Sequence, residues 1–543
     1  MKIQFSDRIR SAALILAAIC LTCGAMSAFT LSEDRVGVAA TPTPTPAASP
    51  TLSPTATPTP APVMTVAALQ SSIRSRLFRP ELRRGQVGIK VVSQNTGKVI
   101  YEDNSEKYFM PASNMKNFTV AAALERLTPD FKFVTGVYAA APPDTAGNVS
   151  GDLRIAGRGD ISISTRFTDG DYYKRLDDLA DKIVQAGVKH VSGGLVGDET
   201  YFEGDPLNGT WEIEDISSPD GAEVSALPLN DNAIDIVVQP GPVGYACSVK
   251  VTPLNPIMRV VNQCLTSRSG TARTLNVIKR LDQNILEITG MVPAGDPGYS
   301  DSIAISHPAD LFVALLKQRL ELKGVTVGGG TRTVSQRTEL APAQNVEIAR
   351  LESPPLSFIA AQTMKPSQNM YTETLLWTMG EESRRSIAVG TAAVPSGPSA
   401  QLGLAVVRNF LTSVGIPQDA VIQKDGSGLS RRDLVTPAAV VQLYLYMAKQ
   451  SKYAQAWRDA LAIGGIDGTL RRRFAGTRAS GNLHGKTGTL DQVSALSGYV
   501  TTAAGEPVVF SMIVNGVPVT RDRTAPMDEI VLDLVNFNGK LDQ

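Results

Sequence analysis

Histidine is the residue whose scarcity excludes most. The 543-residue chain contains three histidines, His190, His307 and His484, far apart in the sequence. No His-Glu-x-x-His pattern is present, which argues against a zinc peptidase of that type. No Gly-x-Ser-x-Gly turn between a strand and a helix accompanies them either, which argues against a Ser-His-Asp hydrolase. Any acyl chemistry in this chain is therefore expected to use a base other than histidine.

Excess charge of one sign is also absent, because 52 basic residues balance 52 acidic ones. This balance argues against a general polyanion binder, so we expect no nucleic-acid partner. Hydrophobic residues make up 43% of the chain, which is ordinary for a globular protein with a core. Beyond the N-terminal segment, no apolar run is long enough to cross a membrane. The length suggests about three domains.

The first 30 residues have the pattern of an export segment. Lys2, Arg8 and Arg10 precede an apolar run from Ala12 to about Leu31. A basic cluster before such a run predicts a signal peptide or an uncleaved signal anchor over residues 1–30. The protein is therefore expected to be exported, to the periplasm or the cell envelope, and to touch a membrane only through this segment if it stays uncleaved.

A Thr/Pro-rich segment follows at residues 31–67. Its centre, Thr41 to Pro62, favours extended polyproline II and cannot build a core. It is interpreted as a tether or a spacer, at ~3.1 Å per residue.

Cysteine is scarce, with four residues in the chain. Cys20 and Cys23 lie in the export segment, which leaves Cys247 and Cys264 for the mature protein. In an exported protein these two are expected to pair as a disulfide.

Three short fragments carry the chemistry that the histidines cannot supply. They are Ser113-Asn114-Met115-Lys116, Ser367-Gln368-Asn369 and Lys486-Thr487-Gly488. Ser113 and Lys116 lie one helical turn apart, so the lysine can take the serine proton if its pKa is lowered. Each fragment alone has a plain structural reading, as a helix cap, a polar turn or a strand end. Together, in this order, they form a coherent acyl-transfer set.

The local context supports this interpretation. Residues 87–92 and 99–101 read as a β-hairpin before Ser113, and residues 118–127 read as a helix after it. Ser113 is thus expected at a helix N-terminus, which favours developing negative charge. After Lys486, residues 493–500 and 508–514 read as adjacent strands, followed by an amphipathic helix around residues 527–535.

The three fragments resemble the SxxK, SxN and KTG motifs of penicillin-recognising serine acyl-enzymes. The gap from Ser113 to Ser367 is 254 residues (367 − 113), which resembles the low-molecular-mass class C penicillin-binding proteins, the D-alanyl-D-alanine carboxypeptidase/endopeptidases. Similar phrases are Gly157-Arg158-Gly159-Asp160, Leu229-Asn230-Asp231-Asn232 and the stretch from Asp425 to Arg431. The resemblance covers roughly residues 68–543.

The resemblance implies an α/β (α+β) fold: a transpeptidase/β-lactamase-like domain, with an antiparallel sheet flanked by helices, split by a large strand-rich insertion. We predict the catalytic domain over residues 68–140 and 350–543, and the inserted domains over 141–349. Helices are expected near residues 173–186, 358–364 and 371–379, and strands at 233–238 and 285–289.

The implied substrates are peptidoglycan stem peptides ending in D-Ala-D-Ala, or peptide cross-links, with β-lactam antibiotics as covalent inhibitors and with no metal or cofactor. The resemblance assigns the catalytic and substrate-binding roles as follows: Ser113 as the nucleophile, Lys116 as its base, Ser367 and Lys486 as the route of a proton to the leaving amine, Asn369 as a donor to the substrate amide, Thr487, Gly488 and Thr489 as the site of the terminal carboxylate, and the backbone N–H groups of Ser113 and Thr489 as the oxyanion hole. Arg431 is a candidate for side-chain recognition, and is equally well read as a surface arginine.

Two competing functions stay open. A β-lactamase shares the three motifs but has a short first gap, unlike this chain. A non-catalytic penicillin-sensing or wall-binding module could keep the fold while losing the serine or a lysine, whereas all three fragments are intact here.

Overall fold

The computed structural model describes residues 63–339, 346–388 and 396–541. The predicted export segment and most of the predicted tether lie outside the described residues, so those expectations stay predictions. Within the described ranges, no helix combines the length and the apolar character needed to span a membrane.

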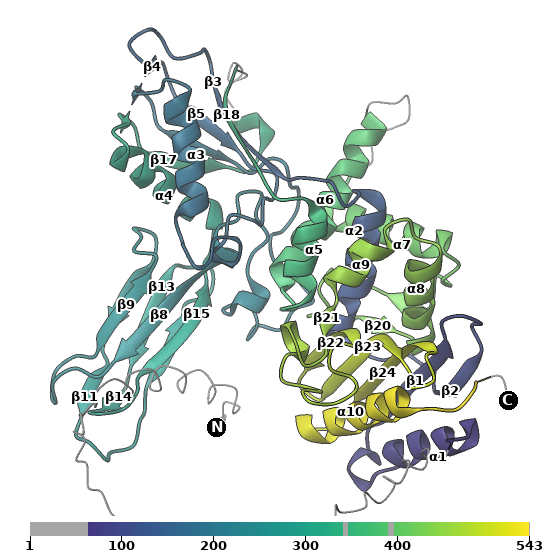
Figure 1. Cartoon of the computed structure of the whole chain (residues 1–543). Coiled ribbons are helices and arrows are strands. Elements are labelled where there is room, and N and C mark those ends of the chain that lie inside the picture. The colour runs from purple at the N-terminus through teal and green to yellow at the C-terminus, as the bar shows by residue number, and fades with distance from the viewer. Residues whose placement is uncertain (1–62, 340–345, 389–395, 542–543) are drawn as a thin grey trace, which may run out of the picture. The chain divides into compact units, whose positions relative to one another are not determined.

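A six-stranded antiparallel sheet organises the motif-bearing part of the chain, in the order β2-β1-β24-β23-β22-β21 (Figure 1). Its strands are β1 (Gln86–Ser93), β2 (Val99–Asp103), β21 (Ala462–Ile463), β22 (His484–Leu490), β23 (Val493–Thr501) and β24 (Pro507–Asn515). The predicted hairpin corresponds to β1 and β2, and the two predicted apolar strands are the neighbours β23 and β24. Lys486 lies within β22, beside β23.

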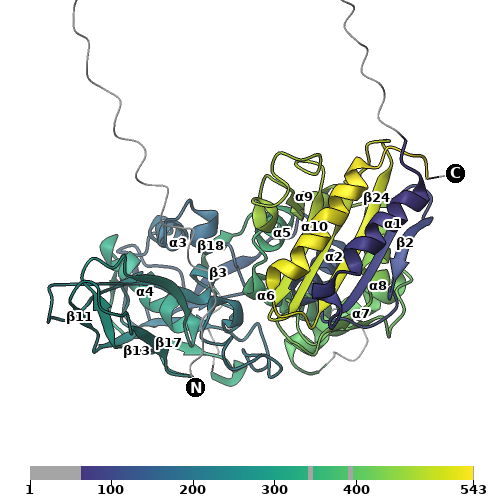
Figure 2. The ribbon, with the colours of Figure 1, turned by 90° about the horizontal axis from the view of Figure 1, so that it is seen from below.

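Helices cover both faces of this sheet. On one face, α1 (Val66–Leu77) and α10 (Thr520–Asn536) lie side by side (Figure 2). Alternate residues of β24 face opposite ways, as expected for a strand. Phe510 and Met512 join the cluster that includes α1 and α10, whereas Val509 and Ile513 join the cluster on the other face. A strand buried on both faces is mostly apolar, which explains the hydrophobic residues on both sides of Ser511 in β24.

The helices that belong to the second cluster surround α2 (Lys116–Arg126). Nine of its eleven residues are buried, and the small side chains of Ala121, Ala122 and Ala123 let neighbouring helices approach closely. These neighbours are α5 (Leu356–Met364), α6 (Asn369–Ala388), α7 (Ser399–Ser413), α8 (Pro437–Lys449) and α9 (Ala454–Ala460). The two helices predicted beside Ser367 are α5 and α6, with α6 longer than expected.

The inserted part contains a five-stranded mixed sheet in the order β17-β7-β5-β3-β18. The strands are β3 (Val134–Ala139), β5 (Leu153–Ala156), β7 (Leu195–Asp198), β17 (Thr331–Val334) and β18 (Val346–Glu352). The outgoing strand β3 and the returning strand β18 pair with each other, so this sheet begins before residue 141 and continues past residue 349. The chain thus leaves and re-enters the motif-bearing part through one pair of strands.

Two helices pack on this inserted sheet, α3 (Lys174–Gln185) and α4 (Pro308–Leu322). The sequence predicted α3, which has a clear apolar stripe. It did not predict α4, which contains a continuous buried apolar stretch, Leu311 to Leu316, followed by a more polar end.

The rest of the inserted part is built of short strands. One sheet is β15-β8-β9, with β8 (Ala233–Gln239), β9 (Ser248–Thr252) and β15 (Tyr299–Ala304). A second is β10-β13-β12, with β10 (Arg259–Asn262), β12 (Asn276–Lys279) and β13 (Ile285–Thr289). The remaining strands of the inserted part are β4 (Asn148–Val149), β6 (His190–Val191), β11 (Leu265–Ser267), β14 (Met291–Pro293) and β16 (Thr326–Val327). Two further short strands, β19 (Val421–Ile422) and β20 (Leu434–Val435), pair with each other in the motif-bearing part.

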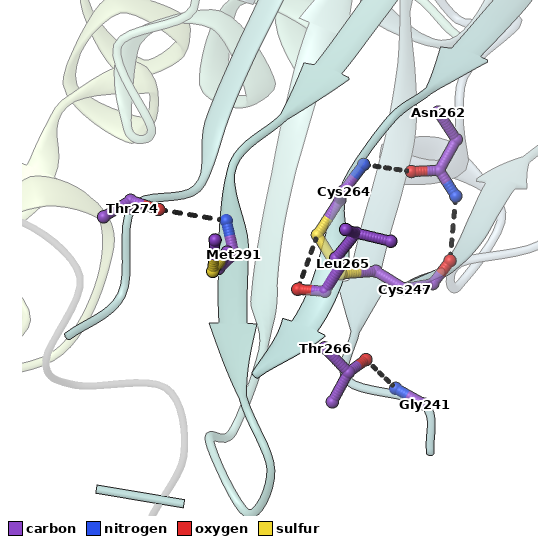
Figure 3. Close-up of a disulfide and its surroundings, with 8 residues drawn as sticks. All are labelled: Gly241, Cys247, Asn262, Cys264, Leu265, Thr266, Thr274 and Met291. Carbon is purple, nitrogen blue, oxygen red and sulfur yellow. Dashed lines mark hydrogen bonds between the residues drawn. A yellow bond between two sulfur atoms is a disulfide. The ribbon is translucent and has the colours of Figure 1, made fainter. Parts of the chain in front are cut away.

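A disulfide joins Cys247, directly before β9, to Cys264, directly before β11 (Figure 3). The same two residues share a backbone hydrogen bond, 2.9 Å from the Cys247 nitrogen to the Cys264 oxygen. The Asn262 amide contacts both, at 2.8 Å to the Cys247 oxygen and 3.1 Å from the Cys264 nitrogen. The disulfide and these three hydrogen bonds all lie within the inserted part. The bridge therefore constrains only the inserted part.

Candidate active site

Ser113 and Lys116 lie at the junction between a short 3₁₀ helix, Ala112–Met115, and α2. The Lys116 side chain is fully buried, and its Nζ lies 2.9 Å from Ser113 Oγ. Ser113 itself is partly exposed, so its hydroxyl can meet a substrate while the lysine stays shielded from water. The structure therefore brings these two predicted residues together.

Three oxygen atoms from three separate segments surround the Lys116 amine. They are Ser113 Oγ at 2.9 Å, Asn369 Oδ1 at 2.6 Å and the Ser427 carbonyl at 2.8 Å. A neutral amine has two N–H groups and one lone pair. It can donate to the amide and carbonyl oxygens, which cannot donate in return, and accept from the hydroxyl. The arrangement suits a lysine that takes the serine proton.

Burial also lowers the pKa of Lys116, from its usual value to about 8. The carboxyl groups of Asp425, Asp220, Glu373 and Asp433 oppose this shift, because negative charge favours the ammonium form. Burial nevertheless has the larger effect, so the neutral amine is accessible near physiological pH.

Lys486 is the second fully buried lysine of the site. Its Nζ lies 2.7 Å from Ser367 Oγ and 2.9 Å from the Thr487 carbonyl. Burial and the nearby charge of Lys116 hold the pKa of Lys486 well below its usual value. Burial is the larger cause at both lysines, and the repulsion between the two amines adds to it at Lys486.

Ser367 and Asn369 lie where α5 ends and α6 begins. Ser367 has a φ of 71°, a left-handed conformation that is strained for a residue with a side chain. Asn369 Nδ2 donates to the Asp220 carbonyl at 3.0 Å, while its Oδ1 contacts Lys116. Because an amide nitrogen carries two hydrogens, one N–H of Asn369 is still available for a substrate.

The Lys486-Thr487-Gly488 segment of β22 passes close to the Ser113 loop. At Gly488 a Cβ atom would lie 2.5 Å from the Pro111 carbonyl, so only glycine allows this approach. Asn114 Nδ2 also donates to the Lys486 carbonyl at 3.1 Å. The strand and the loop are therefore held in a fixed relation.

The two threonines of this strand differ in their surroundings. Thr487 is buried, and its hydroxyl contacts Thr469 Oγ1 at 2.7 Å. Thr489 is exposed at the end of the strand.

Arg431 is held between two other segments. Its Nε lies 2.9 Å from Glu212 Oε2 of the inserted part, and its Nη1 lies 3.1 Å from the Asp491 carbonyl. The side chain is 31% exposed, so a substrate could still reach it.

No role was predicted for Glu373 and Ser427, which the structure places behind Lys116. Glu373 Oε1 accepts from the Gly426 nitrogen at 2.9 Å and from the Ser427 nitrogen at 2.7 Å. The same peptide segment presents the Ser427 carbonyl to Lys116. The phrase from Asp425 to Arg431 signalled this loop, but Glu373 had no signal, since it lies 54 residues away from Ser427 in sequence.

Gly428 fixes the position of this loop. It has a φ of 82°, and an added Cβ would lie 1.9 Å from the Ala112 carbonyl. Within the described ranges, no group of three or more His, Cys, Asp or Glu side chains is arranged to hold a metal ion.

Comparison with known proteins identifies the family to which this chain belongs. The model of the D-Ala-D-Ala carboxypeptidase 3 (S13) family matches residues 69–534. The chain belongs to this family. Membership in the S13 family confirms the predicted enzyme class, a serine-type D-Ala-D-Ala carboxypeptidase.

Curated relatives match this chain over most of their length. The chain is 33% identical to the D-alanyl-D-alanine carboxypeptidase of Actinomadura sp. strain R39 over 486 residues, which covers 87% of this chain and 85% of that protein. It is 26% identical to the D-alanyl-D-alanine carboxypeptidase DacB of Haemophilus influenzae over 462 residues, covering 83% and 90%.

A solved structure confirms the predicted fold. Penicillin-binding protein 4 (dacB) from Haemophilus influenzae superposes with a TM-score of 0.72 at 23% sequence identity, covering 88% of this chain and 100% of that chain. The predicted split α/β (α+β) architecture is therefore shared with that protein.

Proposed function

We propose that this S13 enzyme forms its acyl-enzyme on Ser113, with Lys116 as the base. One observation carries the assignment: the fully buried amine of Lys116 lies 2.9 Å from the hydroxyl of Ser113, a residue that is partly exposed. Ser113 Oγ attacks the carbonyl of the penultimate D-alanine, and its proton moves to Lys116 Nζ. The C–N bond to the terminal D-alanine then breaks, and water later hydrolyses the ester.

Ser367 and Lys486 supply the proton that the leaving amine needs. Their side chains are 2.7 Å apart, so a proton given up by Ser367 Oγ can be replaced from Lys486. The backbone N–H groups of Ser113 and Thr489 stabilise the oxyanion, an interaction of ~3 kcal/mol per donor in other enzymes.

The substrate is a peptidoglycan stem peptide ending in D-Ala-D-Ala, or a peptide cross-link. Lys486, Thr487, Gly488 and Thr489 bind the terminal carboxylate, and the free N–H of Asn369 donates to the substrate amide. Arg431, together with Glu212, recognises the stem-peptide side chain. Both carboxypeptidase and endopeptidase activity are compatible with this arrangement.

β-Lactams are proposed as covalent inhibitors that acylate the same serine. The dacB protein of Haemophilus influenzae has been solved in complex with a β-lactam, and this chain resembles that structure with a TM-score of 0.67 at 23% identity. The amide-like bond of such a ring occupies the place of the scissile peptide bond.

We also propose that the protein works outside the cytoplasm, in the periplasm or the cell envelope. The basic and apolar residues 1–30 and the pairing of Cys247 with Cys264 both support export.

The serine assignment is tested with Ser113→Ala. The variant should lose covalent labelling by a fluorescent penicillin and D-alanine release from a pentapeptide, while keeping its fold. Ser72→Ala is the matched control, because that hydroxyl lies on α1 and contacts Asp533. Labelling that persists in Ser113→Ala would contradict the assignment.

A further inference from the structure

The turn Asn230-Asp231-Asn232 in the inserted part is strained at three consecutive positions. The φ angles are 48°, 61° and 53°, all in the left-handed region that residues with side chains rarely adopt. Such strain persists only where surrounding contacts enforce it, and it gathers at functional positions.

The two asparagines hold this turn in place. Asn230 Oδ1 accepts from the Thr165 nitrogen at 3.1 Å. Asn232 Oδ1 accepts from the Leu229 nitrogen at 2.9 Å, and its Nδ2 donates to the Glu223 carbonyl at 2.7 Å. These contacts fix the flanks of the turn and leave the central Asp231 directed at other segments.

Asp231 reaches the Ser367-Gln368-Asn369 loop of the catalytic site. Its Oδ2 accepts from Gln368 Nε2 at 3.1 Å, and its Oδ1 accepts from the Tyr371 hydroxyl in the first turn of α6. Ser164 Oγ and Arg166 Nη2 also donate to it, at 2.7 Å and 3.1 Å, and hold the carboxylate from its own side. The inserted part thus forms a hydrogen bond with Gln368, the middle residue of the Ser367-Gln368-Asn369 fragment.

That loop needs external support. Ser367 is itself in a left-handed conformation, with φ of 71°. A cavity of ≈ 420 Å³ lies against the loop, lined by Ser367, Gln368, Asp220 and Asp231 among others, so packing does not enclose the loop on that side. Two of its hydrogen bonds come from the inserted part, Asp231 to Gln368 and the Asp220 carbonyl to Asn369.

We propose that Asp231 is a positioning residue that holds Ser367 in place through Gln368. The proposal rests on the role proposed above for Ser367, delivery of a proton to the leaving amine. Asp231 touches no reacting atom. Its loss would let the loop relax from its strained conformation, and Ser367 Oγ would move away from the scissile nitrogen.

This role has a chemical signature. An amine must receive a proton as its C–N bond breaks, whereas a thiolate can leave without one, because a thiol has a pKa of roughly 8.5. Misplacing Ser367 should therefore slow cleavage of a D-Ala-D-Ala amide much more than cleavage of the matching thioester, in which sulfur replaces the scissile nitrogen. General loss of structure would slow both alike.

The test compares kcat/KM for these two substrates, since that constant reports the steps up to acyl-enzyme formation. Asp231→Ala removes both carboxylate oxygens, and with them the hydrogen bond to Gln368. We expect the amide to lose ~10-fold or more and the thioester less than ~3-fold; this is less than the full ~10²–10⁴-fold contribution of a general acid, because Ser367 is displaced and not removed. Asp235→Ala is the matched control, since its carboxylate contacts Ser302 Oγ at 2.5 Å, and it should leave the ratio unchanged.

Two further variants keep the proposal testable if Asp231→Ala folds poorly. Gln368→Glu leaves the strained turn intact but places a second carboxylate against that of Asp231. It should show the same selective loss of amide cleavage. The double variant Asp231→Asn/Gln368→Glu restores the hydrogen bond with its direction reversed, and should recover most of the amide activity.

An equal fall with both substrates, no fall with either, or a double variant as slow as Gln368→Glu would overturn the proposal. The Ser113→Ala result separates this failure from a failure of the proposed function. If Ser113→Ala abolishes both reactions, the nucleophile stands whatever Asp231 does.

Discussion

Around Ser113 and Lys486, the motif-bearing part of the chain supplies the side chains that exchange protons. The inserted part supplies hydrogen-bond acceptors that position the loop around Ser367. Lys116 contacts oxygens of Ser113, Asn369 and Ser427, all from the motif-bearing part. The insert contributes the Asp220 carbonyl and the Asp231 carboxylate, which contact the loop around Ser367. Reaction and support are therefore divided between two regions of the sequence.

This comparison predicts that substitutions in the motif-bearing part lower the rate of acylation. Substitutions in the inserted part should instead change the ratio of amide to thioester cleavage, or the stability of the protein. The largest effect is expected for Lys116→Ala. Loss of the base should lower penicillin acylation by ~10³-fold, within the range of general base catalysis. Stopped-flow or labelling kinetics measure this. Lys174→Ala is the control, because its amine pairs with Asp178 on the surface of the insert. Acylation at the normal rate in Lys116→Ala would show that the proton path is wrong.

Lys486→Ala is expected to have the next largest effect. It should reduce both peptide binding and acylation, by ~10²-fold in kcat/KM, because one side chain serves the carboxylate and the proton route. A rise in KM together with a fall in kcat distinguishes it from Lys116→Ala. If only KM rises, Lys486 has no part in proton transfer.

Gly428→Ala probes how strongly the loop behind Lys116 is fixed. The new methyl group would meet the Ala112 carbonyl, and the left-handed φ of 82° disfavours it further. We expect acylation to fall ~10-fold and the free energy of unfolding to fall by ~1–3 kcal/mol, the cost of such strain. Gly324→Ala is a matched control in the insert, with a φ of 82° and no atom within 4 Å of the added Cβ. It should lose stability without a selective loss of acylation.

The smallest effect on catalysis is expected at the disulfide. Cys247→Ser/Cys264→Ser should lower the stability of the insert by ~3 kcal/mol, since the bridged residues are 17 apart in sequence. Acylation at 25 °C should be unchanged, because the bridge lies wholly within the insert. Thermal unfolding and acylation kinetics on the same sample check both parts. A matching loss of acylation would show that the two regions are coupled more strongly than proposed.

Local patterns in the sequence predicted most of the motif-bearing part. The Gly97-containing turn between β1 and β2, and the apolar runs of β23 and β24, are signals that neighbouring residues carry. The candidate residues could be named because serine and lysine one turn apart have a specific chemistry. That these residues lie close together in space could not be predicted from local patterns, since Lys486 and Ser367 are 119 residues apart in sequence.

The unpredicted features are those that depend on distant partners. Helix α4 contains six consecutive buried apolar residues, Leu311 to Leu316, so this stretch of its sequence shows no helical period. Glu373 looks like an ordinary helix carboxylate until the Gly426 and Ser427 nitrogens are seen against it. Asp231 and Gln368 are 137 residues apart, in regions that the sequence assigned to different domains.

The central claim is that Lys116 acts as a neutral base, and the pH dependence of penicillin acylation tests it most directly. Burial lowers the pKa of Lys116 to about 8. Below that pH the amine is protonated and cannot accept the Ser113 proton, and above it the amine is neutral. The second-order acylation constant should therefore rise about tenfold per pH unit at low pH and level off above a midpoint near 8. A constant that does not change with pH between about 6 and 9, or that falls as pH rises, would contradict the account.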